Sequence, residues 1–151
     1  MIQYTFEIIH RRDIGRIRPL WENLRSYHLA RSPYFRSFYE GFTFEERTRK
    51  FMDPGIRLRL EMAMNDEEPA AYCIASIDGA GEGEIDSIFV GEAHRGRRIG
   101  ERLVGNACGW FDEEKVLVKK VVVMYGNEEA LEFYRKAGFY PAHCTLKWKE
   151  Q

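Results

Sequence analysis

The order of apolar patterns in the second half of the chain constrains its fold more than any other feature. A strand pattern over residues 84–90 precedes a polar loop, an amphipathic helix pattern over 99–114 and a continuous apolar run over 121–124. Such a run is typical of a strand that is buried on both faces. Two strands that are joined through a helix lie parallel, with a right-handed crossover. The sequence therefore predicts a sheet that contains a parallel pair.

The other strand patterns predict antiparallel pairing. They cover residues 4–8, 58–64, 70–77 and 142–149. Because only short turns connect 58–64, 70–77 and 84–90, we expect these three strands to be antiparallel neighbours. The predicted fold class is α/β (α+β), with a single mixed and mostly antiparallel sheet that is flanked by helices.

Three further helices are predicted from apolar spacing and capping residues. Apolar residues recur at helical spacing over 19–32 and 128–137. Thr43, followed three residues later by Glu46, is typical of a capping box and predicts a helix over 44–52.

Length and composition limit the class of protein. A chain of 151 residues favours one domain over residues 1–151. The 23 basic and 24 acidic residues argue against affinity for nucleic acid or an anionic membrane, and no apolar run is long enough for a membrane helix. Cys73, Cys108 and Cys144 are too widely spaced for a disulfide framework or a metal site. We expect buried, reduced thiols, a cytoplasmic protein and no bound metal.

The loop at residues 91–100 joins a strand to a helix and is rich in glycine and arginine. The first N–H groups of a helix have no partner within it, and they favour a phosphate or pyrophosphate. Gly96 and Gly100 allow the backbone to approach such a ligand, and the arginines add charge-assisted hydrogen bonds. Taken alone, the loop is explained equally well as a solvated basic surface.

Its residues resemble motif A of the GNAT superfamily of N-acetyltransferases, which is usually written Gln/Arg-x-x-Gly-x-Gly/Ala. The corresponding residues are Arg95-Gly96-Arg97-Arg98-Ile99-Gly100, with Arg98 where the family commonly has its first glycine. Residues 127–139 are similar to motif B, whose pattern is Asn, Ala, Phe-Tyr and Gly-Phe. Residues 84–90 resemble the fourth strand of the family.

The resemblance implies acetyl-CoA as the acetyl donor. Its pyrophosphate would lie on the amides of residues 95–100, and its pantetheine arm would run along the fourth strand, which splays from the fifth in this family. The donor-binding residues implied are Ile88, Phe89, Val90, Arg95, Gly96, Arg97, Arg98, Ile99, Gly100, Glu101, Asn127 and Tyr134.

The resemblance also implies two catalytic residues. Amine acetylation requires that a proton leave the ammonium group and that the departing thiolate gain one. Glu84 is similar to the glutamate that part of the family uses as general base, although Asp86, expected on the same strand face, or a water relay would also serve. Tyr134 is similar to the tyrosine that protonates the thiolate, and the N–H of Ile88 would hold the oxyanion. The structural alternatives are a solvated Glu84 and a core aromatic Tyr134.

The acceptor is not identified by any motif. The aromatic segment 34–42 is expected either to form an acceptor wall or to cap the core. The leading hypothesis is an N-acetyltransferase that acts on a primary amine of a small molecule, an amino-acid derivative or a protein. The alternative is a catalytically silent acyl-CoA-binding module. An exposed strand edge suggests a homodimer.

Overall fold

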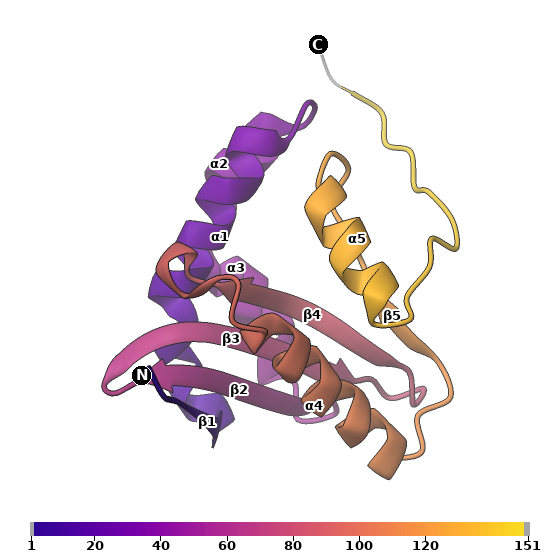
Figure 1. The fold of residues 1–151 in the computed structure, drawn as a ribbon. Helices are drawn as coiled ribbons and strands as arrows, with labels where there is room; N and C mark the ends of the chain where they lie inside the picture. The colour runs from indigo at the N-terminus through magenta and orange to yellow at the C-terminus, as the bar shows by residue number, and fades with distance from the viewer. Residues whose placement is uncertain (1, 150–151) are drawn as a thin grey trace.

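The computed structural model describes residues 2–149 and contains one five-stranded sheet in the order β1-β2-β3-β4-β5 (Figure 1). Neighbouring strands are antiparallel except for β4 and β5, which are parallel. The strands are β1 (Tyr4–Ile9), β2 (Arg57–Asn65), β3 (Glu68–Ile77), β4 (Gly83–Val90) and β5 (Lys119–Val121). The predicted mixed sheet, its antiparallel neighbours and its parallel pair are confirmed.

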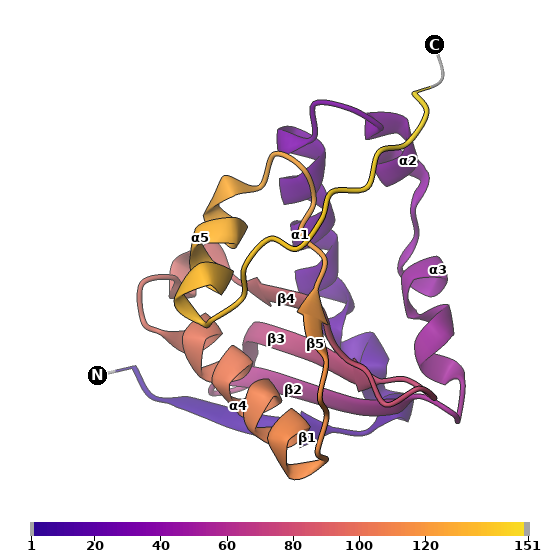
Figure 2. The ribbon, with the colours of Figure 1, turned by 90° about the vertical axis from the view of Figure 1, so that its right-hand side faces the viewer.

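Helices cover both faces of the sheet, as Figures 1 and 2 show. One face carries α4 (Ile99–Glu113) and α5 (Glu128–Lys136). The other carries the N-terminal helices, which are η1 (Arg11–Ile17), α1 (Arg18–Arg31), α2 (Arg36–Gly41), α3 (Phe44–Thr48) and η2 (Arg49–Met52). Over residues 2–149, none of the helices combines the length and the apolar character that crossing a bilayer requires.

Strand β3 divides the interior into two cores because its side chains alternate between the faces. Tyr72 and Ile74 pack with the N-terminal helices, whereas Cys73 and Ala75 pack with α4. All four residues are buried, as expected for a strand that is covered on both faces.

A β-bulge interrupts the alternation of β4. Ile74 lies opposite Ser87 and Ala75 opposite Ile85, which leaves Asp86 as the extra residue. Ser87 consequently shares a face with Asp86: its hydroxyl contacts the Tyr72 hydroxyl at 2.7 Å, within the core under the N-terminal helices. Strict alternation along the strand would place Ser87 on the same face as Ile85, but the bulge shifts every following side chain by one position.

Two strand predictions at the end of the chain are also wrong. Strand β5 ends at Val121, and the side chain of Val122 is 78% exposed rather than buried. Residues 142–149 form no strand, and Trp148 is 89% exposed. An apolar pattern indicates which face of a strand is buried, but it does not specify the strand with which it pairs. The outer edge of β5 pairs with no other described strand. Cys144 lies in this segment and is exposed, contrary to the expectation.

The N-terminal helices follow the sequence signals at their beginnings more than at their ends. Helix α1 matches its prediction, but the helix expected over 44–52 consists of α3 followed by the tighter turns of η2. Helix α2 was not predicted. Its N-cap is Phe35, whose side chain makes no capping hydrogen bond, so that the sequence carries no capping signal here. The φ of Phe35 is 59°, a left-handed conformation that is unusual for a large side chain.

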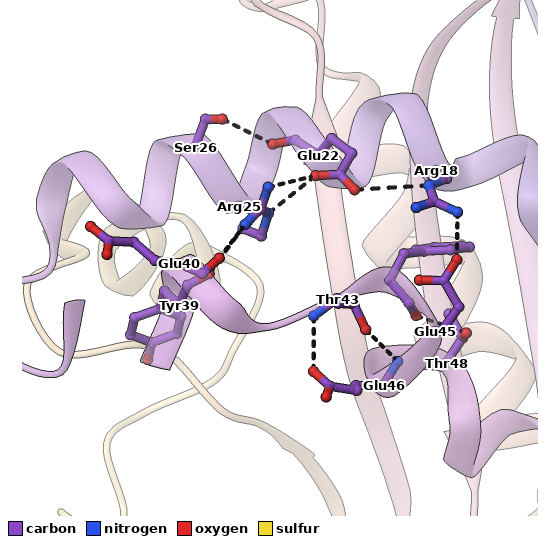
Figure 3. A network of polar contacts seen from close by, with 11 residues as sticks. Arg18, Glu22, Arg25, Ser26, Tyr39, Glu40, Thr43, Glu45, Glu46 and Thr48 are labelled. Atoms are coloured by element: carbon purple, nitrogen blue, oxygen red, sulfur yellow. Dashed lines mark hydrogen bonds and ion pairs between the residues drawn. The ribbon is translucent and has the colours of Figure 1, made fainter. Parts of the chain in front are cut away.

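The capping box of α3 is formed as predicted. The Glu46 amide donates to Thr43 Oγ1 at 3.1 Å, and the Thr43 amide donates to the Glu46 carboxylate at 3.0 Å (Figure 3). We expect Thr43→Ala to lower the free energy of unfolding by about 1 kcal/mol, measured by urea denaturation. Thr43→Ser keeps the acceptor oxygen and is the control, and an equal loss in both variants would exclude the cap as the cause.

Candidate active site

Strands β4 and β5 separate soon after they pair. Three residue pairs join them, Gly83 with Lys119, Glu84 with Lys120 and Ile85 with Val121. From residue 86 to residue 90 the outer edge of β4 faces no other described strand. Side chains satisfy two of its carbonyl groups instead: Arg47 donates to that of Asp86, and Arg95 Nε donates to that of Val90 at 3.1 Å. The edge is therefore a slot that an extended ligand can enter.

The loop after β4 holds two residues in the left-handed conformation. Gly96 has a φ of 77°, and Arg98, the N-cap of α4, has a φ of 60°. Glycine adopts this conformation without a steric penalty, whereas for a residue with a Cβ it costs roughly 1–2 kcal/mol of conformational free energy. Arg98 therefore keeps the backbone shape that a glycine would give, at a cost in stability, and it adds a positive charge beside the first turn of α4.

A cavity of about 370 Å³ lies at the N-terminus of α4. The predicted loop residues that line it are Val90, Arg95, Gly96, Arg98, Ile99, Gly100 and Glu101, whereas Arg97 does not. Lys136 of α5 adds a further positive charge that the sequence did not indicate. Gly100 is needed for close packing here, since a Cβ at this position would lie 3.3 Å from the Phe133 ring.

A second cavity of about 510 Å³ lies between the N-terminal helices, the open edge of β4 and α5. It shares Val90, Arg95, Gly100 and Phe133 with the first cavity, so that the two adjoin. It also brings together predicted residues from distant parts of the chain: Glu84, Ile88, Phe89, Asn127 and Tyr134. The slot along β4 thus connects the cationic loop to this second cavity, called the chamber below, which is lined by both predicted catalytic side chains, Glu84 and Tyr134.

Tyr134 is 6% exposed and packs edge-on against the rings of Phe133 and Phe139. Its hydroxyl makes no hydrogen bond to the other described residues, yet it is not sealed from the cavity. Burial raises the pKa of Tyr134 above its usual value, because the tyrosinate would lose its solvation. The side chain therefore keeps its proton well above neutral pH.

The two carboxylates of β4 differ in how far they are available. The side chain of Asp86 is completely buried, accepts a hydrogen bond from Ser76 Oγ at 2.5 Å and forms an ion pair with Lys50. The side chain of Glu84 is 22% exposed, and its carboxylate lies 3.7 Å from Lys50 Nζ. Glu84 is thus the carboxylate that a ligand can reach, whereas Asp86 is occupied by its contacts with Ser76 and Lys50.

Asn127 caps helix α5 from inside the cavity wall. Its Oδ1 accepts a hydrogen bond from the Ala130 amide at 3.2 Å, so that the carboxamide is fixed and its NH₂ group remains for another partner. The residue is buried and lines the second cavity. This position is consistent with a contact to an extended ligand in the slot.

The N-terminal helices supply the opposite wall of the second cavity. Tyr39 and Phe42 of the aromatic segment line it, but Tyr34 and Phe38 are exposed, so that only part of the segment meets the cavity. His28 also lines the wall, and burial together with the charge of Arg31 lowers its pKa, which keeps the ring neutral at neutral pH. The sequence offered no signal for His28, since a lone histidine on a helix has no recognisable partner.

No significant relative is found among curated sequences. A solved structure of the BH1408 protein from Bacillus halodurans is similar, with a TM-score of 0.75, 16% identity and coverage of 97% of this chain and 99% of that chain. A ribosomal-protein-alanine N-acetyltransferase from Brucella melitensis biovar Abortus 2308 has a TM-score of 0.65, 18% identity and coverage of 99% and 100%. The aminoglycoside N-acetyltransferase AAC(6')-Iy in complex with CoA has a TM-score of 0.67, 14% identity and coverage of 97% and 99%.

These structural similarities establish the fold, and the sequence establishes the family. The model of the acetyltransferase (GNAT) family matches residues 21–139. This range includes most of α1, the helices α2, α3 and η2, the open edge of β4, the loop before α4 and helix α5, which supply the residues that line both cavities. The chain therefore belongs to the acetyltransferase (GNAT) family.

Proposed function

We propose that the protein transfers an acetyl group from acetyl-CoA to a primary amine, directly and within a ternary complex. The observation that carries the proposal is the slot between β4 and β5, which joins the cationic loop to the chamber that contains Glu84 and Tyr134. A donor with an anionic head and an extended arm matches this arrangement in both charge and shape.

The donor would bind along the slot. Its pyrophosphate meets the amides of residues 95–100, with positive charge from Arg98 and Lys136, which both line the first cavity. Its pantetheine arm extends along β4 past the backbone of Ile88 and Val90. The Arg95 hydrogen bond to the Val90 carbonyl occupies one of these backbone groups, and donor binding would displace it.

The reaction needs three proton transfers, two from the amine nitrogen and one to the leaving thiolate. Glu84 removes a proton from the ammonium group, directly or through a water, and the free amine attacks the thioester carbonyl to form the new C–N bond. The N–H of Ile88 stabilises the oxyanion, the nitrogen loses its second proton to solvent, and the C–S bond then breaks. Tyr134 gives its proton to the departing thiolate and regains one from solvent. Burial keeps the phenol protonated at neutral pH and also makes it a weaker acid, so that the role rests on the position of Tyr134 in the second cavity.

Binding and turnover distinguish the enzyme from a silent acyl-CoA-binding module. Calorimetric titration with acetyl-CoA, coenzyme A and ATP tests the donor site, and release of free thiol in the presence of amines tests transfer. We expect micromolar binding of acetyl-CoA and amine-dependent thiol release. Binding without release for any amine would favour the silent module, and no binding by folded protein would overturn the proposal.

The base is tested with Glu84→Gln. We expect kcat near neutral pH to fall at least about tenfold, and the loss to shrink as the pH approaches the pKa of the amine, about 10, because free amine needs no base. Glu82→Gln is the matched control, since Glu82 pairs with Lys120 outside both cavities. A loss that is independent of pH would contradict a proton-accepting role for Glu84.

We also propose a cytoplasmic, homodimeric protein that binds no metal and no nucleic acid. The three free cysteines are consistent with a reducing compartment. The outer edge of β5, which pairs with no other described strand, is a surface on which a second copy can associate. Size-exclusion chromatography with light scattering measures the assembly state.

A further inference from the structure

Four charged side chains meet where β4 enters the second cavity: Arg47 from α3, Lys50 from η2, and Glu84 and Asp86 from β4. Their charges are unevenly paired. Lys50 contacts both carboxylates, and Asp86 has Ser76 as an additional hydrogen-bond donor. The two acids therefore share one cation, and Arg47 belongs to neither pair.

Arg47 forms no ion pair with any carboxylate of residues 2–149. Its single hydrogen bond is to the Asp86 carbonyl, and its guanidinium lies 5.4 Å from the centre of the Phe51 ring. A guanidinium has more N–H donors than this contact uses, and they lie in a plane that suits a carboxylate. Because Arg47 is half-buried and lines the cavity, its free donors have lost part of their solvation without gaining an anion.

Of the other arginines that line the cavity, Arg25 is paired with a carboxylate and Arg95 lies on the donor side. Arg25 pairs with Glu22 and donates to the carbonyl groups of Tyr39 and Glu40. Arg95 belongs to the loop, lines both cavities and donates to the Val90 carbonyl on the donor side. Arg47 is therefore the cation that remains for a ligand at the end of the slot away from the loop.

Glu84 and Arg47 thus present opposite charges to the same part of the chamber. An ammonium group beside Glu84 and a carboxylate on Arg47 would satisfy both, and the apolar rings of Trp21 and Phe42 line the same cavity. Resting on the proposed function, we propose that the acceptor is an amino acid or a related amino-carboxylate with an apolar side chain, and that Arg47 binds its carboxylate. A simple amine would leave the Arg47 guanidinium desolvated and unpaired.

The proposal is tested with pairs of acceptors that differ only in the carboxylate. Suitable pairs are phenylalanine with 2-phenylethylamine and leucine with 3-methylbutylamine, assayed by thiol release with saturating acetyl-CoA. We expect kcat/KM of the wild type to favour the amino acid at least about tenfold, the range of a charge-assisted hydrogen bond. Arg47→Gln should abolish this preference by raising KM for the amino acid, with little change for the amine.

Two further variants separate recognition from structure. Arg47→Lys retains the charge and should keep part of the preference, whereas Arg49→Gln, an exposed neighbour outside the cavity, should keep all of it. Thermal unfolding of each variant verifies that the fold is intact.

The outcomes separate the acceptor class from the proposed function. Equal use of amines and amino acids, or an equal loss of both in Arg47→Gln, would overturn the role of Arg47 and leave acetyl transfer in place. Donor binding without turnover of any pair would overturn the acceptor class alone. A folded protein that does not bind acetyl-CoA would overturn the proposed function, and the acceptor class with it.

Discussion

Replacing Tyr134 with phenylalanine is expected to lower kcat about 100-fold or more, the usual contribution of a positioned general acid. The variant removes one hydroxyl that has no hydrogen-bond partner among residues 2–149 and faces the cavity. Without it, the thiolate must leave unprotonated or take its proton from water. The measurement is the steady-state rate of thiol release at saturating acetyl-CoA.

The same variant should leave the fold and the donor affinity almost unchanged. The ring keeps its contacts with Phe133 and Phe139, so that we expect the free energy of unfolding to change by less than about 0.5 kcal/mol. Tyr140→Phe, at an exposed position, is the matched control. If Tyr134→Phe retained wild-type activity, the tyrosine would be a core aromatic without a part in the chemistry.

The raised pKa of Tyr134 gives this prediction a pH signature. Deprotonation of an ordinary tyrosine would remove the acid as the pH rises through about 10. Burial moves this loss to higher pH, since the neutral phenol is favoured. The wild-type rate should therefore show no decline from this group near pH 10, and a decline that Tyr134→Phe abolishes would contradict the raised pKa while supporting Tyr134 as the acid.

Gly100→Asp is expected to weaken acetyl-CoA binding at least about 100-fold, measured by calorimetry. The carboxylate would lie in the first turn of α4, where the donor pyrophosphate is proposed to bind, and two charges about 4 Å apart near a protein surface repel by up to about 4 kcal/mol. The new Cβ would also contact the Phe133 ring at 3.3 Å, which narrows the junction of the two cavities.

Two controls test whether the lower acetyl-CoA affinity of Gly100→Asp comes from its charge, from its size or from a change in helix propensity. Gly100→Ala adds the methyl group alone and should lower the affinity much less than Gly100→Asp. Gly105→Asp places the same side chain on an exposed turn of α4 with no neighbour within 4 Å of its Cβ, and it should leave binding unchanged. Equal binding by Gly100→Asp and the wild type would mean that the pyrophosphate does not meet the start of α4.

Patterns that act within a few residues could be interpreted from the sequence. The Thr43–Glu46 capping box formed, because both partners lie in one helical turn. Helices α4 and α5 begin at the residues predicted from their apolar spacing and, for α4, from the loop that precedes it. The residues of the loop lie together around the first cavity for the same reason, since a continuous segment carries them.

Local patterns could not predict which residues line the chamber, because these residues come from strands and helices that are far apart in the sequence. The bulge at Asp86 depends on the register of β4 against β3, and it turned Ser87 to the face that the alternation had excluded. Arg47 and Lys50 reach β4 from about forty residues away, and Lys136 reaches the loop from another helix.

The sequence by itself determined the family, the order of most elements and the loop that is proposed to bind the donor. Only the tertiary structure decided how far β4 and β5 pair, that residues 142–149 add no strand to the sheet, and that Arg47 is left without a carboxylate. The physical reason is that side-chain order along a strand fixes a face, whereas partner, register and ion pairing depend on elements that the chain brings together only when it folds.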